Sequence, residues 1–381
     1  MASNTTTLKV MTYNIRVNTL NDWSLIPSRN NTWYYRKDSV INLIRRYSPD
    51  LFGVQEALSG QMSDLRNGLY DYDSYGVGRD DGREGGEFGG VFYRCDRFEW
   101  LEDGTFWLSD TGEIGERGWG ADCPRICSWV KLKDRKTEKE IYHFNTHLDH
   151  RSCEAREKSA DLILKKIKEK AGSTPVILTG DFNTESNSRA YRTIINDSDF
   201  GDAKELSEES HEGPNGTWST FNVEFDIDSR IDYIFITPTY FKTLTHQHLT
   251  DHHNNKYYPS DHLPVLAKLD YKTHRYQGTQ ETLVGVDVVT LEDLESAAKH
   301  SGDRAAKVEA VFKVAEPMTR TGSNLLIFDL SQKRVNHLQG IQFFEKVYID
   351  GTPFGVWIFK RGTFENKGEL GYVIVFLKFI Y

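Results

Sequence analysis

The stretch from Pro175 to Asn183 has the sequence PVILTGDFN, and the fold can be built outward from it. Its first half is apolar and rich in β-branched residues, which predicts a short buried strand. Its second half places a glycine, a carboxylate and an amide where that strand ends. α/β sheets carry functional groups at these carboxyl ends, because the ends open onto a shared crevice. Asp181 and Asn183 are therefore candidate site residues on one face of the chain.

A strand–helix–strand unit leads into this stretch. Residues 141–147 predict a strand that ends at His147. Apolar residues between 160 and 167 then recur with the spacing of one helical face, and the strand that runs into Asp181 follows. His147 and Asp181 should therefore lie at the same edge of a sheet.

The same pattern occurs near the start of the sequence. Residues 8–15 alternate apolar and polar side chains, and apolar residues from 40 to 47 have helical spacing. A second strand is predicted over 50–56. These two strands end near Asn14 and Glu56. The repetition indicates either an internal duplication or the ordinary pattern of α/β proteins, and the sequence leaves both open.

Two later segments also bring polar residues next to strands. Residues 230–236 predict a strand with Asp232 near its start. Asp261 and His262 lie in the segment 258–265, which leads into Leu266-Ala267-Lys268-Leu269. Both segments add candidate carboxylate and imidazole groups to the site.

Two further segments are expected to form loops. Residues 76–90 contain many glycines with Arg79, Arg83 and Glu87, but lack the ending of a phosphate-binding P-loop. They predict either a mobile hairpin loop or a loop that contacts substrate. Residues 246–253 contain four histidines whose spacing does not match a standard zinc motif, so we expect a polar surface loop.

Length and charge limit the classes of protein. The 381 residues suit one large domain and a smaller one. A net charge of -9 and a pI near 5.8 argue against a surface that grips long nucleic acid. They do not exclude a nuclease, because a bound metal ion supplies local positive charge.

Targeting signals and cysteine spacing indicate the compartment. Residues 1–7 do not resemble a signal peptide, and no segment approaches the roughly 20 apolar residues of a membrane helix. The four cysteines form no CxxC pair and are expected to be free thiols in a reducing compartment. We therefore expect a cytoplasmic protein without a membrane span.

Together the strand ends resemble the endonuclease/exonuclease/phosphatase superfamily, the deoxyribonuclease-I-like metal-dependent phosphoesterases, over about residues 8–270. The motifs, in the family's order, are Thr12-Tyr13-Asn14, Gln55-Glu56, Asn145-Thr146-His147, Gly180-Asp181-Phe182-Asn183, Arg230-Ile231-Asp232-Tyr233 and Ser260-Asp261-His262. The resemblance implies an α/β fold, a four-layered sandwich of two mixed sheets with helices outside.

The domain boundary is expected near residue 272. Residues 1–272 would form the catalytic domain, and residues 283–381 a smaller β-rich C-terminal domain of unknown function. That accessory domain would either bind an unknown ligand or protein or only cover apolar surface.

The resemblance also implies residue roles. Asn14, Glu56 and Asp261 would hold Mg²⁺ or Mn²⁺ through hard oxygen ligands. Asp181 would orient or deprotonate the attacking water, and Asn183 would donate a hydrogen bond to the phosphoryl group.

Three further residues would complete the chemistry. His147 and His262 would bracket the phosphate, as donors or as an acid–base pair. Asp232 would hold His262 in one tautomer. The choice of general base between Asp181 and His262 stays open.

The expected function is metal-dependent hydrolysis of a phosphoester, with a phosphodiester as the leading substrate class. Short or single-stranded nucleic acid remains a candidate substrate despite the acidic charge. One alternative is a phosphomonoesterase or a sphingomyelinase-like enzyme that acts on a small phosphorylated molecule or a lipid head group. Another is an inactive, hydrolase-like binding protein, which is disfavoured because no matched catalytic position is substituted.

Overall fold

The structure is a computed structural model that describes residues 7–18, 31–196, 198–252 and 257–272, with the backbone of three strands between 341 and 378. The chain divides into two compact units, Met1–Lys272 and Thr273–Tyr381. Each unit is described by itself.

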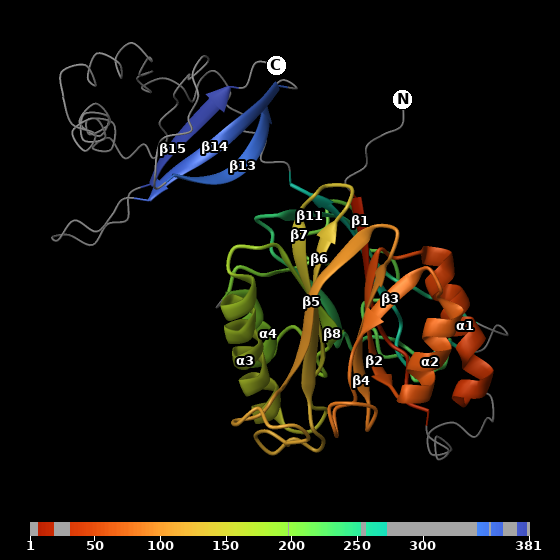
Figure 1. Cartoon of the computed structure of the whole chain (residues 1–381). Helices are drawn as coiled ribbons and strands as arrows, with labels where there is room; N and C mark the ends of the chain where they lie inside the picture. Colours follow the sequence, from red (N-terminus) through yellow and green to blue (C-terminus); the bar gives the residue numbers. More distant parts are fainter. Residues whose placement is uncertain are drawn as a thin grey trace, which may run out of the picture. The chain divides into compact units, whose positions relative to one another are not determined.

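The first sheet of the larger unit has the strand order β11-β12-β1-β2-β4-β3 (Figure 1). Its strands β1 and β2 are parallel, whereas the other neighbours are antiparallel, so the sheet is mixed. The bounds are β1 (Thr7–Asn14), β2 (Leu51–Ala57), β3 (Tyr72–Tyr75), β4 (Phe88–Arg94), β11 (Phe241–His248) and β12 (Val265–Tyr271).

The second sheet has the order β5-β6-β7-β8-β10-β9. It is also mixed, because β7 and β8 are parallel and the other pairs are antiparallel. The bounds are β5 (Phe98–Trp107), β6 (Ile126–Asp134), β7 (Glu140–His147), β8 (Val176–Asp181), β9 (Gly201–Asp202) and β10 (Asp232–Ile236).

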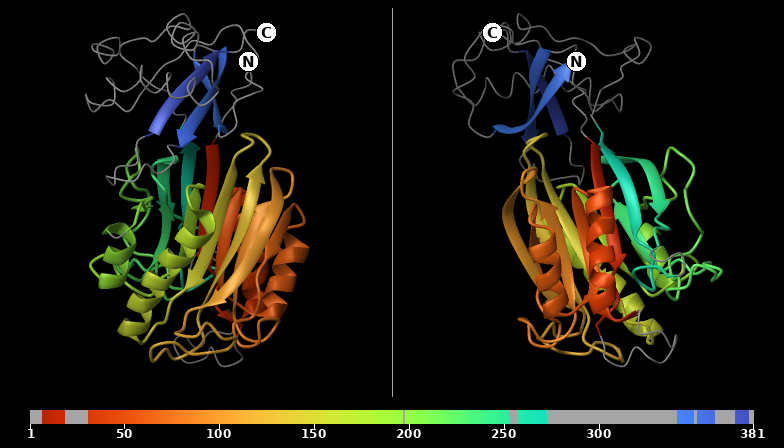
Figure 2. Two further views of the ribbon diagram at one scale, coloured as in Figure 1. Left: turned by 60° about the vertical axis from the view of Figure 1, so that its left-hand side comes forward. Right: turned by 90° about the vertical axis from the view of Figure 1, so that its right-hand side faces the viewer.

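Helices cover the outer faces of the two sheets. The helix bounds are α1 (Trp33–Tyr47), α2 (Ser59–Gly68), α3 (Cys153–Ala171) and α4 (Arg189–Asn196). The pair α1 and α2 lies beside the first sheet and the pair α3 and α4 beside the second, as the turned views also show (Figure 2). The expected four-layered α/β sandwich is therefore confirmed.

The two sheets meet through an apolar layer with a polar centre. Leu8 and Val10 of the first sheet and Ile177 and Ile234 of the second belong to one buried cluster. At the centre, Asn145 donates from Nδ2 to the backbone oxygens of Val54 and Gly90, at 2.9 and 3.0 Å. These two bonds join the second sheet to the first. The Asn145 amide is buried away from water, so backbone oxygens of the facing sheet accept its hydrogens.

The close approach at this point explains a glycine in β2. A Cβ added to Gly53 would lie 2.2 Å from Asn145 Oδ1. The same oxygen accepts a hydrogen bond from Gln55 Nε2 at 2.7 Å. Gln55 and Asn145 of the predicted motifs therefore join the sheets beneath the site.

Both predicted strand–helix–strand units form parallel pairs, β1-α1-β2 and β7-α3-β8. Each pair directs its carboxyl ends the same way, so polar side chains at strand ends share one edge. Within α3, Ala160, Ile163 and Ile167 are buried as the helical spacing predicted. The matching units fit a duplication and the ordinary α/β pattern equally well.

The smaller unit contains a three-stranded antiparallel sheet of β13 (Ile341–Ile349), β14 (Thr352–Lys360) and β15 (Tyr372–Lys378). Residues 273–340, where the expected accessory domain begins, lie outside the described residues. The assignment of an accessory domain stays a prediction. All four cysteines are free thiols. In the described part of the chain, no helix has both the length and the hydropathy needed to cross a bilayer.

Candidate active site

Strand ends from both sheets deliver all eight predicted residues to one connected cluster. The first sheet contributes Asn14 and Glu56, and the second contributes His147, Asp181 and Asp232. The segments that flank β8 and β12 supply the remaining residues, which are Asn183, Asp261 and His262. The contacts described below join seven of them directly to another member, and Asp261 is joined through Arg16.

Asn14 links the two sheets at the centre of the cluster. Its Nδ2 donates to Glu56 Oε1 and to Asp181 Oδ2, each at 2.9 Å. Its Oδ1 accepts the backbone N–H of Arg16 at 3.0 Å. Arg16 has a positive φ of 58°, so the chain turns back over the site directly after β1. Asn14 therefore fixes the separation of two buried carboxylates.

Glu56 is held as a carboxylate. Burial favours its neutral form, but the positive charges of His147, Arg16 and His262 outweigh that effect and lower the pKa of Glu56 to about 2. The hydrogen bond from Asn14 acts in the same direction. Glu56 also accepts the backbone N–H of Val17 at 2.9 Å. The group is ionised at neutral pH and can hold a cation.

Asp232, His262 and Asp181 form a chain of charges. His262 Nδ1 lies 2.8 Å from Asp232 Oδ2, and His262 Nε2 lies 3.8 Å from Asp181 Oδ2. Burial opposes the imidazolium, but the two carboxylates raise the pKa of His262 well above its ordinary value. The Nδ1 contact with Asp232 leaves Nε2 directed toward the Asp181 carboxylate.

The surroundings of Asp181 disfavour its charged form, whereas those of His262 favour the charged form. Burial and the neighbouring Asp232 charge raise the pKa of Asp181, although His262, His147 and the Asn14 hydrogen bond oppose the rise. A carboxylate with a raised pKa is a better proton acceptor than an ordinary one. Its surroundings therefore make Asp181 a stronger base than an exposed aspartate.

His147 and Asn183 lie on the other side of Asp181. Asn183 Nδ2 donates to the Leu148 backbone oxygen, and it also lies 3.0 Å from His147 Nε2. His147 Nε2 is 3.6 Å from Asp181 Oδ2. Asn183 has a positive φ of 48°, and its backbone N–H donates to Asp181 Oδ1 at 2.9 Å. The left-handed turn after β8 therefore brings the amide back toward the carboxylate.

Asp261 approaches the cluster through Arg16. The Arg16 guanidinium lies 3.6 Å from Asp261 Oδ2 and 3.8 Å from Glu56 Oε2. Burial is the main cause that raises the pKa of Asp261, and the charge of Glu56 adds to it. Two buried carboxylates thus converge on one positive group, which is the electrostatic setting that a divalent metal ion also satisfies.

The donor set fits a hard divalent cation. One ligand atom each of Glu56, His147 and Asp181 lies within 4.8 Å of the other two. Carboxylate oxygens are the ligands that Mg²⁺ and Mn²⁺ prefer. As placed, Asn14 turns its nitrogen and not its oxygen toward the carboxylates, so its predicted metal role requires a flip of the amide.

Sequence reasoning did not assign roles to two residues that contact the site. Glu87 lies 3.6 Å from His147 Nδ1 and forms a two-bond ion pair with Arg79, at 2.6 and 2.9 Å. Thr217 donates from Oγ1 to Asp232 Oδ2 at 2.6 Å. Glu87 belongs to the glycine-rich segment 76–90, whose acidic and basic residues were the only signal available.

The layered fold and this buried set of carboxylates, histidines and amides define the class of phosphoester-hydrolysing α/β sandwiches. The Endonuclease/Exonuclease/phosphatase family model matches residues 11–262, and the chain belongs to that family. The enzymes of this family are generally dependent on divalent metals. The superfamily expected from the sequence motifs is therefore confirmed.

Two solved structures from Bacteroides resemble the larger part of the chain. A family member from Bacteroides vulgatus is 38% identical, covers 70% of this chain and 99% of its own, and has a TM-score of 0.65. A mannosyl-6-phosphatase from Bacteroides thetaiotaomicron is 36% identical, with coverage of 69% and 99% and a TM-score of 0.64.

A third similarity is shorter. The stress response protein YvgO of Bacillus subtilis is 32% identical over 91 residues, which is 24% of this chain. The chain matches 56% of the length of YvgO, slightly more than half.

Proposed function

We propose that the chain is a divalent-metal-dependent phosphatase that hydrolyses a small phosphorylated molecule, with a sugar phosphate as the leading substrate class. The observation that carries the proposal is the charge chain Asp232–His262–Asp181 beside the carboxylates Glu56 and Asp261. It combines a proton acceptor, a cationic donor and a cation-binding set within one buried centre.

Glu56 and Asp261 would hold the metal ion, and Asn14 would join them after an amide flip. When bound, Mg²⁺ or Mn²⁺ supplies charge that polarises a phosphoryl oxygen and stabilises the leaving oxygen. The oxygen-rich donor set supports these two cations over Zn²⁺.

The residues of the chain perform the proton and hydrogen-bond steps. Asp181 accepts a proton from water as the water oxygen bonds to phosphorus, and the bond from phosphorus to the ester oxygen breaks. The released ester oxygen takes a proton from solvent. The imidazolium of His262 donates from Nε2 to a phosphoryl oxygen, where negative charge increases in the transition state. Asp181 is therefore the proposed base, and His262 the proposed electrostatic donor.

His147 and Asn183 complete the phosphate contacts. Asn183 Nδ2 lies 3.0 Å from His147 Nε2, and both histidines of the site lie near Asp181 Oδ2, so the pair could contact a phosphoryl oxygen beside Asp181. Glu87 lies against Nδ1 of His147 and favours a proton on that nitrogen.

The similarity to a mannosyl-6-phosphatase favours a phosphomonoester over the phosphodiester expected from the motifs. The net charge of -9 also favours a small substrate over a long nucleic acid. The test is release of inorganic phosphate from hexose 6-phosphates, compared with cleavage of a short single-stranded oligonucleotide, in Mg²⁺ and in Mn²⁺. Faster turnover of the sugar phosphates supports the proposal, and faster cleavage of the oligonucleotide supports the diester prediction instead.

A further inference from the structure

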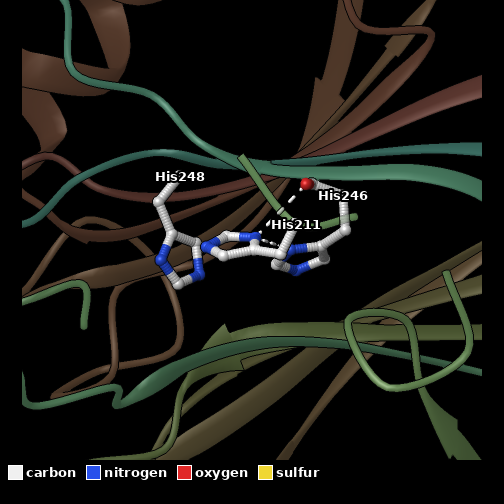
Figure 3. A group of neighbouring side chains, drawn as sticks. All are labelled: His211, His246 and His248. Carbon is white, nitrogen blue, oxygen red and sulfur yellow. Dashed lines mark hydrogen bonds between the residues drawn. The ribbon is translucent and has the colours of Figure 1, made fainter. Parts of the chain in front are cut away.

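A second cluster of ionisable side chains lies away from the candidate active site and consists of His211, His246 and His248 (Figure 3). His246 and His248 belong to β11, and His211 lies in the segment between β9 and β10. One ring nitrogen of each lies within 4.8 Å of the others. The polar surface loop expected over 246–253 is wrong for these residues, because His246 and His248 are 2% and 3% exposed.

Pairing along β11 brings the three rings together. The segment before β10 runs beside β11 and forms bridges that join Ser207 to Thr243 and Glu212 to Gln247. Strand geometry places residues two apart on one face, so His246 and His248 project together toward His211. In the close-up the ring of His211 lies between the other two (Figure 3).

One backbone carbonyl fixes the tautomers of two rings. The Pro214 oxygen lies 3.0 Å from His211 Nε2 and 2.8 Å from His248 Nδ1. A carbonyl only accepts, so both of these nitrogens carry hydrogen. In neutral rings, His211 Nδ1 and His248 Nε2 are then left with lone pairs. A ring N–H that donates to a backbone carbonyl is the usual support of a metal-binding histidine.

Within the described part of the chain, one of these two nitrogens has no partner, and the other faces two groups of His246. His248 Nε2 is buried and has no hydrogen-bond partner among the described residues. His211 Nδ1 lies 3.0 Å from His246 Nδ1 and 3.2 Å from the His246 backbone oxygen. With a lone pair on His211 Nδ1, the backbone oxygen faces a second acceptor, which is unfavourable without a cation between them. The cluster therefore presents lone pairs that would stabilise a cation bound between the rings.

Burial favours the neutral form of the two histidines on β11. Burial, followed by the charge of His211, lowers the pKa of His248 to about 3. Burial and the neighbouring histidines also lower the pKa of His246. Neutral imidazole is the form that ligates metals. The nearby cation Arg230 is paired with Asp202, which reduces its repulsion of a bound ion.

We propose that His211, His246 and His248 form a binding site for Zn²⁺, separate from the centre that would take Mg²⁺ or Mn²⁺. Three imidazole nitrogens suit zinc, whereas Mg²⁺ prefers oxygen ligands. Zinc–nitrogen bonds of about 2.0–2.1 Å require the ligand atoms to approach one another by small ring rotations. Water would take the fourth position.

The zinc ion would fasten an active-site loop to β11. The segment that carries His211 continues to Thr217, which donates to Asp232, and to Ser219, whose N–H donates to the Asp261 backbone oxygen at 2.6 Å. Zinc at the cluster would thus connect the edge of the first sheet to two residues of the catalytic centre through one short segment.

The test measures zinc affinity in a Glu56→Gln background, which weakens metal binding at the active site. His211→Gln and His248→Gln remove ligands, and His252→Gln is the matched control because His252 is exposed and, among the described residues, has a hydrogen bond to the Thr250 backbone oxygen. Competition with a chromophoric zinc chelator should show one equivalent bound in the background and in the control. Each ligand substitution should weaken binding by more than about 100-fold, beyond the 10–100-fold typical of outer-shell partners.

Equal zinc affinity in the ligand variants and the control would overturn the proposal, as would absence of zinc binding in the background protein. X-ray absorption on zinc-loaded protein without the ligand substitutions is independent of how those variants fold. A shell dominated by imidazole nitrogen supports the site. A shell with sulfur or carboxylate oxygen in place of imidazole contradicts it.

Discussion

Replacement of Asp232 by Asn tests the charge that holds His262 in place. Asp232 Oδ2 accepts from His262 Nδ1 at 2.8 Å and from Thr217 Oγ1 at 2.6 Å. The amide has nearly the same volume as the carboxylate and can keep both bonds through its oxygen. The substitution therefore removes charge and leaves the shape of the site largely intact.

The size of the effect follows from the distance between the charges. Two unit charges about 4 Å apart interact with about 4 kcal/mol at an effective dielectric constant of about 20. If cationic His262 loses about 3–4 kcal/mol of this stabilisation in the transition state, kcat/KM should decrease roughly 100- to 1000-fold. The carboxylate charge also raises the pKa of His262. Its removal should move the alkaline limb of the pH–rate profile to lower pH.

The assay is steady-state phosphate release from pH 5 to pH 10, with unfolding curves for each protein. Thr217→Val is the control that keeps the carboxylate charge, because it removes only the Thr217 Oγ1 bond to Asp232 Oδ2 and the bonds that this oxygen accepts from the Ile231 and Asp232 backbone N–H groups. We expect the control to lose less activity than Asp232→Asn and to keep the alkaline limb in place, because the carboxylate charge beside His262 remains. An Asp232→Asn enzyme within about fivefold of wild type, with an unmoved alkaline limb, would refute the role assigned to Asp232.

Three further predictions concern the site and the core. Glu56→Gln should raise the Mg²⁺ concentration needed for half-maximal activity by at least about tenfold, because it removes a charged ligand; an unchanged metal titration would place the metal elsewhere. Asn145→Ala should lower the free energy of unfolding by about 2–4 kcal/mol, since Val54 and Gly90 lose a buried donor, and urea denaturation measures this; a loss below about 0.5 kcal/mol would contradict the bridging role. His143→Leu should make the protein less sensitive to acid. Burial lowers the pKa of His143 to about 3, below its value of about 6.5 in the unfolded chain. The neutral buried ring therefore costs no stability above about pH 6.5, and the free energy of unfolding falls as pH drops below that value. Wild type should lose about 2 kcal/mol more than the variant between pH 7.5 and pH 5, and equal losses would show that His143 does not titrate this way.

The strand–helix–strand units and the site edge could be predicted because the signals there are local, whereas the four layers were implied by the family resemblance. The alternation in residues 8–15 and the helical spacing before Pro175 define elements that depend little on distant contacts. Parallel pairing then places Asn14 and Asp181 at one edge, where the motifs located them. The parallel pairing of the strands is therefore enough to bring these predicted residues to the same edge.

The β11 region could not be predicted in this way. Its strand contains a bulge between Thr243 and Thr245, which shifts the alternation. Phe241 and Thr243 are buried, and after the bulge His246 and His248 take the buried positions. Polar residues in a broken alternation favour a loop when only neighbours in sequence are considered. The partner His211 comes from a separate segment, so no spacing rule indicated it.

The residues missed at the active site have a similar cause. Glu87 reaches His147 because it directly precedes β4, which lies between β2 and β3 in the first sheet. Thr217 reaches Asp232 from an irregular segment with no periodic pattern. Contacts of this kind depend on tertiary packing and not on local sequence preference.

The most direct test of the central claim is phosphate release from a hexose 6-phosphate by metal-stripped wild type and Asp181→Asn, with Mg²⁺ and with chelator. The account predicts turnover by wild type with Mg²⁺, none with chelator, and at least about a 100-fold loss in the folded variant, as expected when a catalytic proton acceptor is removed. Turnover that persists in chelator, or that survives in Asp181→Asn, would contradict it.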